Sequence, residues 1–211
     1  LANIYLELEE QGAGNINLVT PMHFAPTVAD SISKAKSRGL SVPVAINCSG
    51  YDLVSTLRLF DGLVDIYMPD MKYFSAKFSS EYSKASDYFS VCASAIDEMV
   101  RQTGDIVIGS DGLLKKGVIV RHLILPGGLF DSKHIIDYLT SRYGNRIFIS
   151  LMSQYTPIPG MRAPFDRRLT TYEYESVLEE ADRLGFDGFM QERSSAKEEY
   201  TPVFDGSGVL E

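Results

Sequence analysis

Apolar residues along the chain form two alternating patterns. Short runs rich in β-branched residues are typical of strands that are buried on both faces. These runs lie at residues 15–21, 42–50, 63–73, 117–127, 146–155 and 187–192. Between them, apolar residues recur every three or four positions, as in Val28, Ile32 and Ala35, which predicts amphipathic helices. The chain is therefore expected to alternate strand and helix.

Polar residues and glycines mark where these helices begin and end. Asp52, Asp87 and Asp131 are expected to cap helix amino termini, and Thr170 with Glu173 has the spacing of a capping box. Glycines follow the helical segments, as helix-terminating glycines do. They are Gly39, Gly104, Gly144 and Gly185. Repeated strand–helix–strand crossovers predict an α/β fold with a parallel sheet, either open or curved into a barrel.

Three segments depart from this repeat. Asp111-Gly112 lies between two β-prone runs and predicts a β-hairpin insertion around residues 106–120. The periodicity fades after Gly185, so we expect one domain over residues 1–193 and an extended tail over 194–211. The segment 1–12 already has helical spacing and begins with Leu1, not Met. We expect that a segment upstream of it has been removed.

Composition narrows the classes of function. A chain of 211 residues with 45% hydrophobic content fits one globular domain. A formal charge of -8 argues against nucleic acid or an anionic membrane as a partner. No apolar run approaches the ~20 residues of a spanning helix, so we expect a cytoplasmic protein. Cys48 and Cys92 fit neither a disulfide scaffold nor a CxxC metal site, and we expect two buried free thiols.

Polar residues end nearly every predicted strand, where ligands bind in parallel α/β folds. The candidates are Thr20; Asn47 and Ser49; Asp70 and Lys72; Arg121 or His122; and Ser153 or Gln154. Because side chains alternate along a strand, Asp70 and Lys72 share one face, and so do Asn47 and Ser49. Each pair is therefore able to point at a common ligand.

Structural roles are open for the same residues. Asp70 and Lys72 would form a solvated surface pair, and Asn47 with Ser49 would simply open a turn. His122 has the setting of a packed, hydrogen-bonded histidine. The sequence contains no GxSxG, HExxH, GxxxxGK or strand-linked GxGxxG motif, so several common hydrolase and nucleotide sites are excluded.

Together these stretches resemble the pyruvate formate-lyase activating enzyme homologues of the radical S-adenosylmethionine superfamily. The matching stretches are NINLVTPMHF, INCSGYD, VDIYMPDMKY, VIVRHLILPG, ISLMSQYTP and FDGSGV, in the family's order. The resemblance implies a partial, TIM-like (β/α) barrel of six parallel strands. In that family a CxxxCxxC loop after the first strand binds a [4Fe-4S] cluster, whose open iron chelates S-adenosylmethionine. This sequence has no such motif, so the first strand and the cluster loop are expected to be missing.

The resemblance also implies roles for residues in this chain. Thr20 would end the strand near the amino group of the cofactor, and Asp70 with Lys72 matches the family's Asp-x-Lys. The full set implied to bind S-adenosylmethionine is Thr20, Asn47, Ser49, Asp70, Lys72, Arg121 and Gln154. No residue is implied to be catalytic, and none to bind a metal.

The implied activity is the reductive cleavage of S-adenosylmethionine to a 5′-deoxyadenosyl radical. In activating enzymes this radical abstracts a hydrogen from a glycine of a partner glycyl radical enzyme. We expect this chain alone to be inactive, and its edge strand around 17–19 to invite self-association. Two alternatives stay open: a lyase or aldolase that forms a Schiff base through Lys72, and a non-catalytic binding module.

Overall fold

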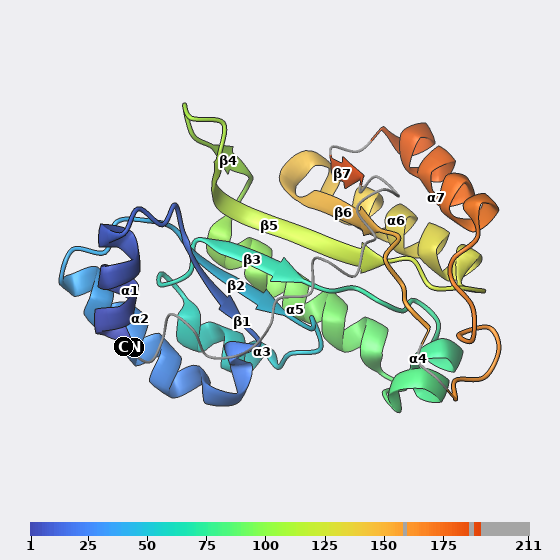
Figure 1. The fold of residues 1–211 in the computed structure, drawn as a ribbon, viewed down its shortest axis with the longest axis horizontal. Helices are drawn as coiled ribbons and strands as arrows, with labels where there is room; N and C mark the ends of the chain where they lie inside the picture. The colour runs from blue at the N-terminus through green and yellow to red at the C-terminus, as the bar shows by residue number, and fades with distance from the viewer. Residues whose placement is uncertain (158–159, 186–187, 191–211) are drawn as a thin grey trace.

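A curved, mostly parallel sheet organises the molecule (Figure 1). The computed structural model describes residues 1–157, 160–185 and 188–190. Within these residues the strand order is β1-β2-β3-β5-β6-β7, and every pair along this path is parallel. The strands are β1 (Ile16–Val19), β2 (Val44–Cys48), β3 (Ile66–Pro69), β5 (Leu114–Leu123), β6 (Phe148–Met152) and β7 (Gly188–Met190).

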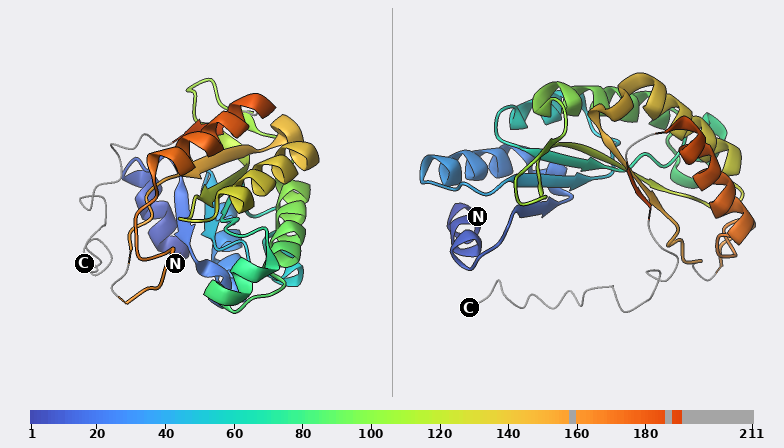
Figure 2. Two further views of the ribbon diagram at one scale, coloured as in Figure 1. Left: turned by 90° about the vertical axis from the view of Figure 1, so that its right-hand side faces the viewer. Right: turned by 90° about the horizontal axis from the view of Figure 1, so that it is seen from above.

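Helices connect the strands and cover the outer side of the sheet. Figure 2 shows α5, α6 and α7 following its convex side. The helices are α1 (Ala2–Glu10), α2 (Ala25–Ser37), α3 (Val54–Leu57), α4 (Ala76–Ser83), α5 (Tyr88–Thr103), α6 (Leu129–Tyr143) and α7 (Thr171–Leu184). Short 3₁₀ turns lie at η1 (Pro21–Phe24), η2 (Arg58–Phe60) and η3 (Gly144–Arg146). Among the residues that are described, no helix combines the length and the apolar character needed to span a bilayer.

The two faces of the sheet have different environments. Along β5, Val118 and Val120 are fully buried, whereas Ile119 and Arg121, which alternate with them, are only partly buried. The outer face packs against the helices and forms the main core. The inner face is partly open, and Val19 on the first strand is 67% exposed. The predicted α/β fold, a partial barrel of parallel strands that does not close, is confirmed.

The hairpin insertion is also confirmed. Strand β4 (Val107–Ile108) pairs antiparallel with the beginning of β5, and the turn between them contains Gly112 with a φ of 77°. Glycine adopts this left-handed conformation without steric cost. The tail expected over 194–211, and the boundary at residue 193, lie outside the described residues.

Helix ends follow the predictions in part. Thr170 and Glu173 form a complete capping box at the start of α7. Gly104, Gly144 and Gly185 occupy the carboxyl-terminal cap positions of α5, α6 and α7. These ends are therefore encoded locally. The capping box satisfies backbone amides at the start of α7, and each glycine adopts a backbone conformation that ends its helix.

The aspartates expected as amino-terminal caps behave differently. Asp52 and Asp131 are not caps, because α3 and α6 begin after other residues. Asp87 lies at the cap position of α5 but makes no side-chain capping bond. The carboxylate of Asp131 instead accepts hydrogen bonds from the amides of Phe74 and Ser75, at 2.6 and 2.8 Å. It therefore fixes a distant loop rather than its own helix.

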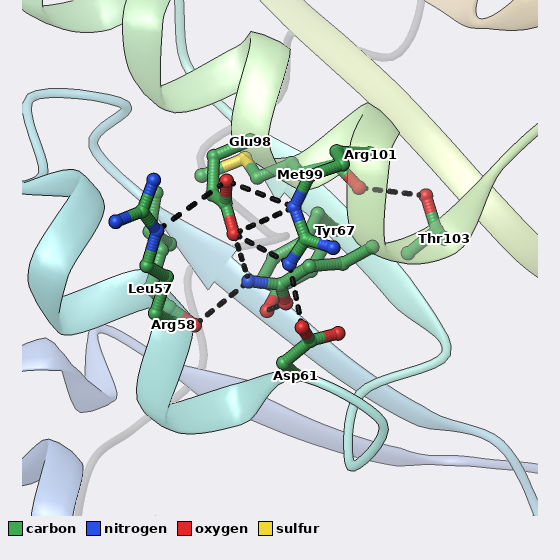
Figure 3. Close-up of polar contacts among 9 residues, drawn as sticks. Leu57, Arg58, Asp61, Tyr67, Glu98, Met99, Arg101 and Thr103 are labelled. Carbon is green, nitrogen blue, oxygen red and sulfur yellow. Dashed lines mark hydrogen bonds and ion pairs between the residues drawn. The ribbon is translucent and has the colours of Figure 1, made fainter.

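A buried carboxylate ties α5 to the segment after β2 (Figure 3). Glu98 accepts hydrogen bonds from Arg101 Nη2 at 2.8 Å and Gln102 Nε2 at 2.9 Å, and Arg58 Nε lies 3.8 Å away. Arg101 also pairs with Asp61 at 2.6 Å. The hydrogen bonds from Arg101 hold the pKa of Glu98 down, at about 2. The ionised carboxylate of Glu98 therefore joins α5 to the segment that contains Arg58 and Asp61.

Candidate functional site

Four polar side chains form a row across the open face of the sheet. Asp70 pairs with Arg121 across β3 and β5, and Arg121 pairs with Ser150 across β5 and β6. Ser49 lies beside Asp70, because the preceding residues of β2 and β3 are in register. We call Ser49, Asp70, Arg121 and Ser150 the polar row. It lies toward the carboxyl ends of the strands, where ligands bind in parallel α/β folds.

Asp70 pairs with two cationic side chains, Arg121 of the polar row and Lys72. Its Oδ1 lies 2.5 Å from Arg121 Nη2, with the geometry of an ion pair rather than of a directed hydrogen bond. Its Oδ2 lies 3.2 Å from Lys72 Nζ. The Asp70 side chain is only 17% exposed, so this is not a freely solvated surface pair. One carboxylate against two cations leaves one net positive charge.

Arg121 retains an unused donor. Within the residues that the structure describes, its buried Nε has no hydrogen-bond partner. A guanidinium is a favourable partner for a carboxylate because its donors match two carboxylate oxygens. The spare donor and the net positive charge fit a ligand that carries a carboxylate, as S-adenosylmethionine does. Arg121 and Lys72 are the residues that would hold it.

A second part of the site lies at the ends of β1 and β2. Thr20, His23, Cys48, Ser49 and Asp52 are among the residues that line a pocket of about 260 Å³. Thr20 adopts a left-handed backbone with φ 53° and ψ 46°, which is uncommon for a β-branched residue. Burial raises the pKa of the Asp52 carboxyl. Because Thr20 and Ser49 both line this pocket, the structure brings them together, as predicted from their positions.

Asn47 and Gln154 lie apart from this pocket. Asn47 is partly buried in β2, in register with Met68 of β3. Gln154 is exposed beyond the end of β6, where its Nε2 lies 3.9 Å from Met152 Sδ. Contacts of either residue with a cofactor stay predictions.

His122 resolves one ambiguity of the sequence. Adjacent strand residues point to opposite faces, so Arg121 faces the open side and His122 the helices. His122 Nδ1 lies 2.7 Å from Met71 O, and its Nε2 lies 2.9 Å from Ser132 Oγ. Burial lowers the pKa of the imidazole, which favours its neutral form. It is a packed structural histidine that supports the segment between Asp70 and Lys72.

The cysteines do not fit an iron–sulfur cluster. Cys48 and Cys92 are both buried free thiols, as predicted. Burial raises the pKa of Cys48 well above its usual range and that of Cys92 to about 12, whereas cluster ligands are thiolates. Among the described residues, no group of three or more His, Cys, Asp or Glu is placed to hold a metal ion.

Two residues that support the site were not predicted from the sequence. The hydroxyl of Tyr88 forms hydrogen bonds with the Asp70–Lys72 segment. The carboxylate of Asp131 accepts hydrogen bonds from the amides of Phe74 and Ser75, just beyond that segment. A tyrosine at the start of an amphipathic helix looks like any other core residue. In the sequence, only its hydroxyl group and its distance from the Asp70–Lys72 segment distinguish Tyr88 from an apolar core residue.

Comparison with known proteins identifies structural relatives. No family model matches the sequence. An uncharacterized protein of Methanocaldococcus jannaschii is 30% identical over 151 residues, which cover 70% of this chain and 40% of that protein. The chain therefore spans well under two thirds of the length of this curated relative.

Two solved structures share the fold. A domain of pyruvate-formate lyase-activating enzyme from Bacteroides vulgatus matches with a TM-score of 0.60 and 10% identity, over 84% of this chain and 99% of that domain. Native anSMEcpe with bound AdoMet also matches with a TM-score of 0.60 and 10% identity, over 90% of this chain and 53% of that one. The resemblance noted in the sequence is thereby confirmed at the level of the fold: this chain has the fold of a pyruvate-formate lyase-activating enzyme domain.

Proposed function

We propose that this chain forms the S-adenosylmethionine-binding barrel of a radical enzyme of the activating type. The observation that carries the proposal is the placement of Asp70 between Lys72 and Arg121 on the open face of the sheet. The unused Arg121 Nε adds a donor at the same place. The shared fold with an AdoMet-bound protein supports this assignment.

In this proposal each residue has a distinct role. Arg121 and Lys72 bind the carboxylate of the cofactor by charge-assisted hydrogen bonds. Asp70 keeps both cations in place, and its carboxylate is the acceptor for the cofactor's amino group. Thr20 and Ser49 offer hydroxyl groups at the adjoining strand ends. When bound to a reduced cluster, S-adenosylmethionine supplies the radical for hydrogen abstraction.

The iron–sulfur cluster would be held by cysteines outside this sequence, because Cys48 and Cys92 do not fit it. A glycyl radical enzyme is the proposed partner, on the strength of the shared fold. Both statements concern a protein of which this chain is the barrel. Radical cleavage is thus expected only when the chain is joined to a segment that provides the cluster.

Replacing Arg121 by Gln tests the cofactor site directly. The substitution removes the charge and the terminal Nη donors but keeps a shorter polar side chain. Residue 121 takes no part in the pair between Asp70 and Lys72, so that pair is retained. We expect the affinity for S-adenosylmethionine to fall by about 10- to 100-fold, as for the loss of a hydrogen bond to a charged group. Isothermal titration calorimetry on this chain measures the dissociation constant.

The matched control is Arg142→Gln, which removes the same charge from an exposed ion pair with Asp97 on the outer side of the molecule. It should leave the dissociation constant unchanged. Equal affinity in the Arg121 variant and the unmodified chain would contradict the proposed site. For the chemistry, we expect reductive cleavage only from a cluster-bearing longer protein. Borohydride trapping of a carbonyl compound on Lys72 would instead favour the aldolase alternative.

A further inference from the structure

The hydroxyl of Tyr88 lies where two strands of the sheet stop pairing. The backbone hydrogen bond from Asp70 N to Cys48 O, at 3.0 Å, is the last that joins β2 to β3. Beyond this hydrogen bond, the segments that follow β2 and β3 carry Ser49 and Lys72, two of the proposed ligand-binding residues. Tyr88, the first residue of α5, reaches this point from the outer side.

This one hydroxyl contacts both strand ends. The amide of Lys72 donates to Tyr88 Oη at 3.0 Å. The hydroxyl proton faces two carbonyl acceptors, Asp70 O at 3.0 Å and Ser49 O at 3.2 Å. A phenol has one proton to donate, so the two carbonyls share it. Tyr88 thus continues the connection between the strands where the sheet's own hydrogen bonds have ended.

The ring that carries the hydroxyl is held firmly. Tyr88 is 4% exposed, stacks on Tyr51 at 5.7 Å between ring centroids, and meets Tyr73 edge-on at 5.2 Å. Burial raises its pKa far above the usual value, so the hydroxyl keeps its proton. A fixed ring and a permanent donor give the contact a defined geometry.

The carbonyl of Asp70 has little room to move. Cys92 Sγ lies 3.4 Å from it and donates a second, weaker hydrogen bond. A Cβ added at Gly50 would come within 2.1 Å of the same oxygen. Gly50 has a φ of 74°, so the turn after β2 needs a glycine for both reasons. The segment from Asp70 to Lys72 is therefore confined from two sides.

We infer that Tyr88 is a positioning residue for the ligand site: it holds Ser49 and Lys72 at a fixed separation so that both strands address one ligand. This inference rests on the proposed function for the identity of that ligand. Tyr88 itself lies behind the strand ends and acts through the backbone that it binds. No role in contacting the ligand is required of it.

Tyr88→Phe removes the hydroxyl and keeps the ring contacts with Tyr51 and Tyr73. We expect the dissociation constant for S-adenosylmethionine to rise by about tenfold, the effect of one lost hydrogen bond on the arrangement of the site. The amide of Lys72 loses its acceptor, so its hydrogen exchange should accelerate by at least about tenfold. Calorimetry and amide exchange followed by NMR measure the two effects separately.

Tyr67→Phe is the matched control. Tyr67 is fully buried, and its hydroxyl donates to Gln102 Oε1 at 2.7 Å on the outer side of the sheet. The same atom is deleted, so stability should fall in a similar way. The dissociation constant and the exchange of the Lys72 amide should both stay as in the unmodified chain.

The outcomes separate this inference from the function that it builds on. If Tyr88→Phe lowers stability but leaves affinity unchanged, as the control does, the positioning role is overturned. If the unmodified chain binds no S-adenosylmethionine, the proposed function fails. In that case the Lys72 amide decides: unchanged exchange in Tyr88→Phe overturns the inference, and faster exchange in that variant alone supports it.

Discussion

At the scale of single residues, Glu98 shows how one buried carboxylate connects α5 to the segment after β2. It is 6% exposed and accepts from Arg101 and Gln102. Glu98→Gln removes the charge that these donors satisfy, and should reduce the free energy of unfolding by about 1–3 kcal/mol at neutral pH. Urea denaturation measures the change. Glu175→Gln, at an exposed position of α7, is the control and should have little effect.

The same substitution predicts a dependence on pH. The pKa of Glu98 in the folded protein, about 2, lies below its ordinary value of 4.5. A carboxylate with a lowered pKa stabilises the fold fully above pH 4.5, and this contribution disappears as the pH falls towards 2. The difference between the unmodified chain and Glu98→Gln should therefore shrink over this range. A constant difference would show that the charge is not the cause.

Residue roles were predictable where one strand position decides them. Alternation along the apolar run at residues 63–73 placed Asp70 and Lys72 on one face, and the structure pairs them just after β3. The partner of Asp131 was not predictable, because the amides that it receives lie 57 and 56 positions earlier in the chain. An aspartate before an apolar helix looks like a cap in the sequence. The long-range contact outweighs the local preference.

At the scale of elements, the capping box of α7 gives a local test of stability. Thr170 Oγ1 accepts from the amide of Glu173 at 3.2 Å, and the Glu173 carboxylate accepts from the amide of Thr170 at 3.0 Å. Thr170→Ala should lower the free energy of unfolding by about 1 kcal/mol. Thr170→Ser retains a hydroxyl and should restore most of it, as measured by chemical denaturation. Equal losses in both variants would point to packing instead of capping.

Strands and most helices were predictable from periodicity because each buries one apolar face. The register between strands was not, because it depends on how the connections pack. The polar row is a consequence of that register: Arg121 and Ser150 lie in β5 and β6, and Ser49 and Asp70 directly follow β2 and β3. Periodicity therefore predicted which residues share a face of one strand, such as Asp70 and Lys72, but not which residues of different strands meet.

At the scale of the whole molecule, the first strand leaves one edge of the sheet unpaired within the described residues. Among the residues with described positions, strand β1 pairs only with β2, and Val19 on it is 67% exposed. An unpaired edge favours association with a second chain, so we expect concentration-dependent self-association. Val19→Lys should weaken it, because a lysine beside the edge disfavours pairing. Sedimentation velocity over a range of concentrations measures the effect.

Leu53→Lys is the control for this prediction, because Leu53 is 68% exposed but lies outside the sheet. It should leave any association unchanged. A monomer at every concentration would contradict the role of the edge, and equal effects of both variants would point to general surface charge. The open curvature of the sheet itself was indicated by family resemblance, since periodicity alone does not distinguish an open sheet from a curved one.

The two buried thiols, Cys48 and Cys92, provide a built-in probe of local unfolding around the sheet and α5. Cys48 is 3% exposed and Cys92 is fully buried, and burial raises the pKa of both. An alkylating reagent needs an accessible thiolate, so neither cysteine reacts while the sheet and α5 stay packed. The two cysteines lie close to the turn at Gly50: Cys48 ends β2, and Cys92 Sγ of α5 would lie 2.9 Å from a Cβ added at Gly50. Their labelling rates, measured by mass spectrometry, therefore report how often the packing between the sheet and α5 opens.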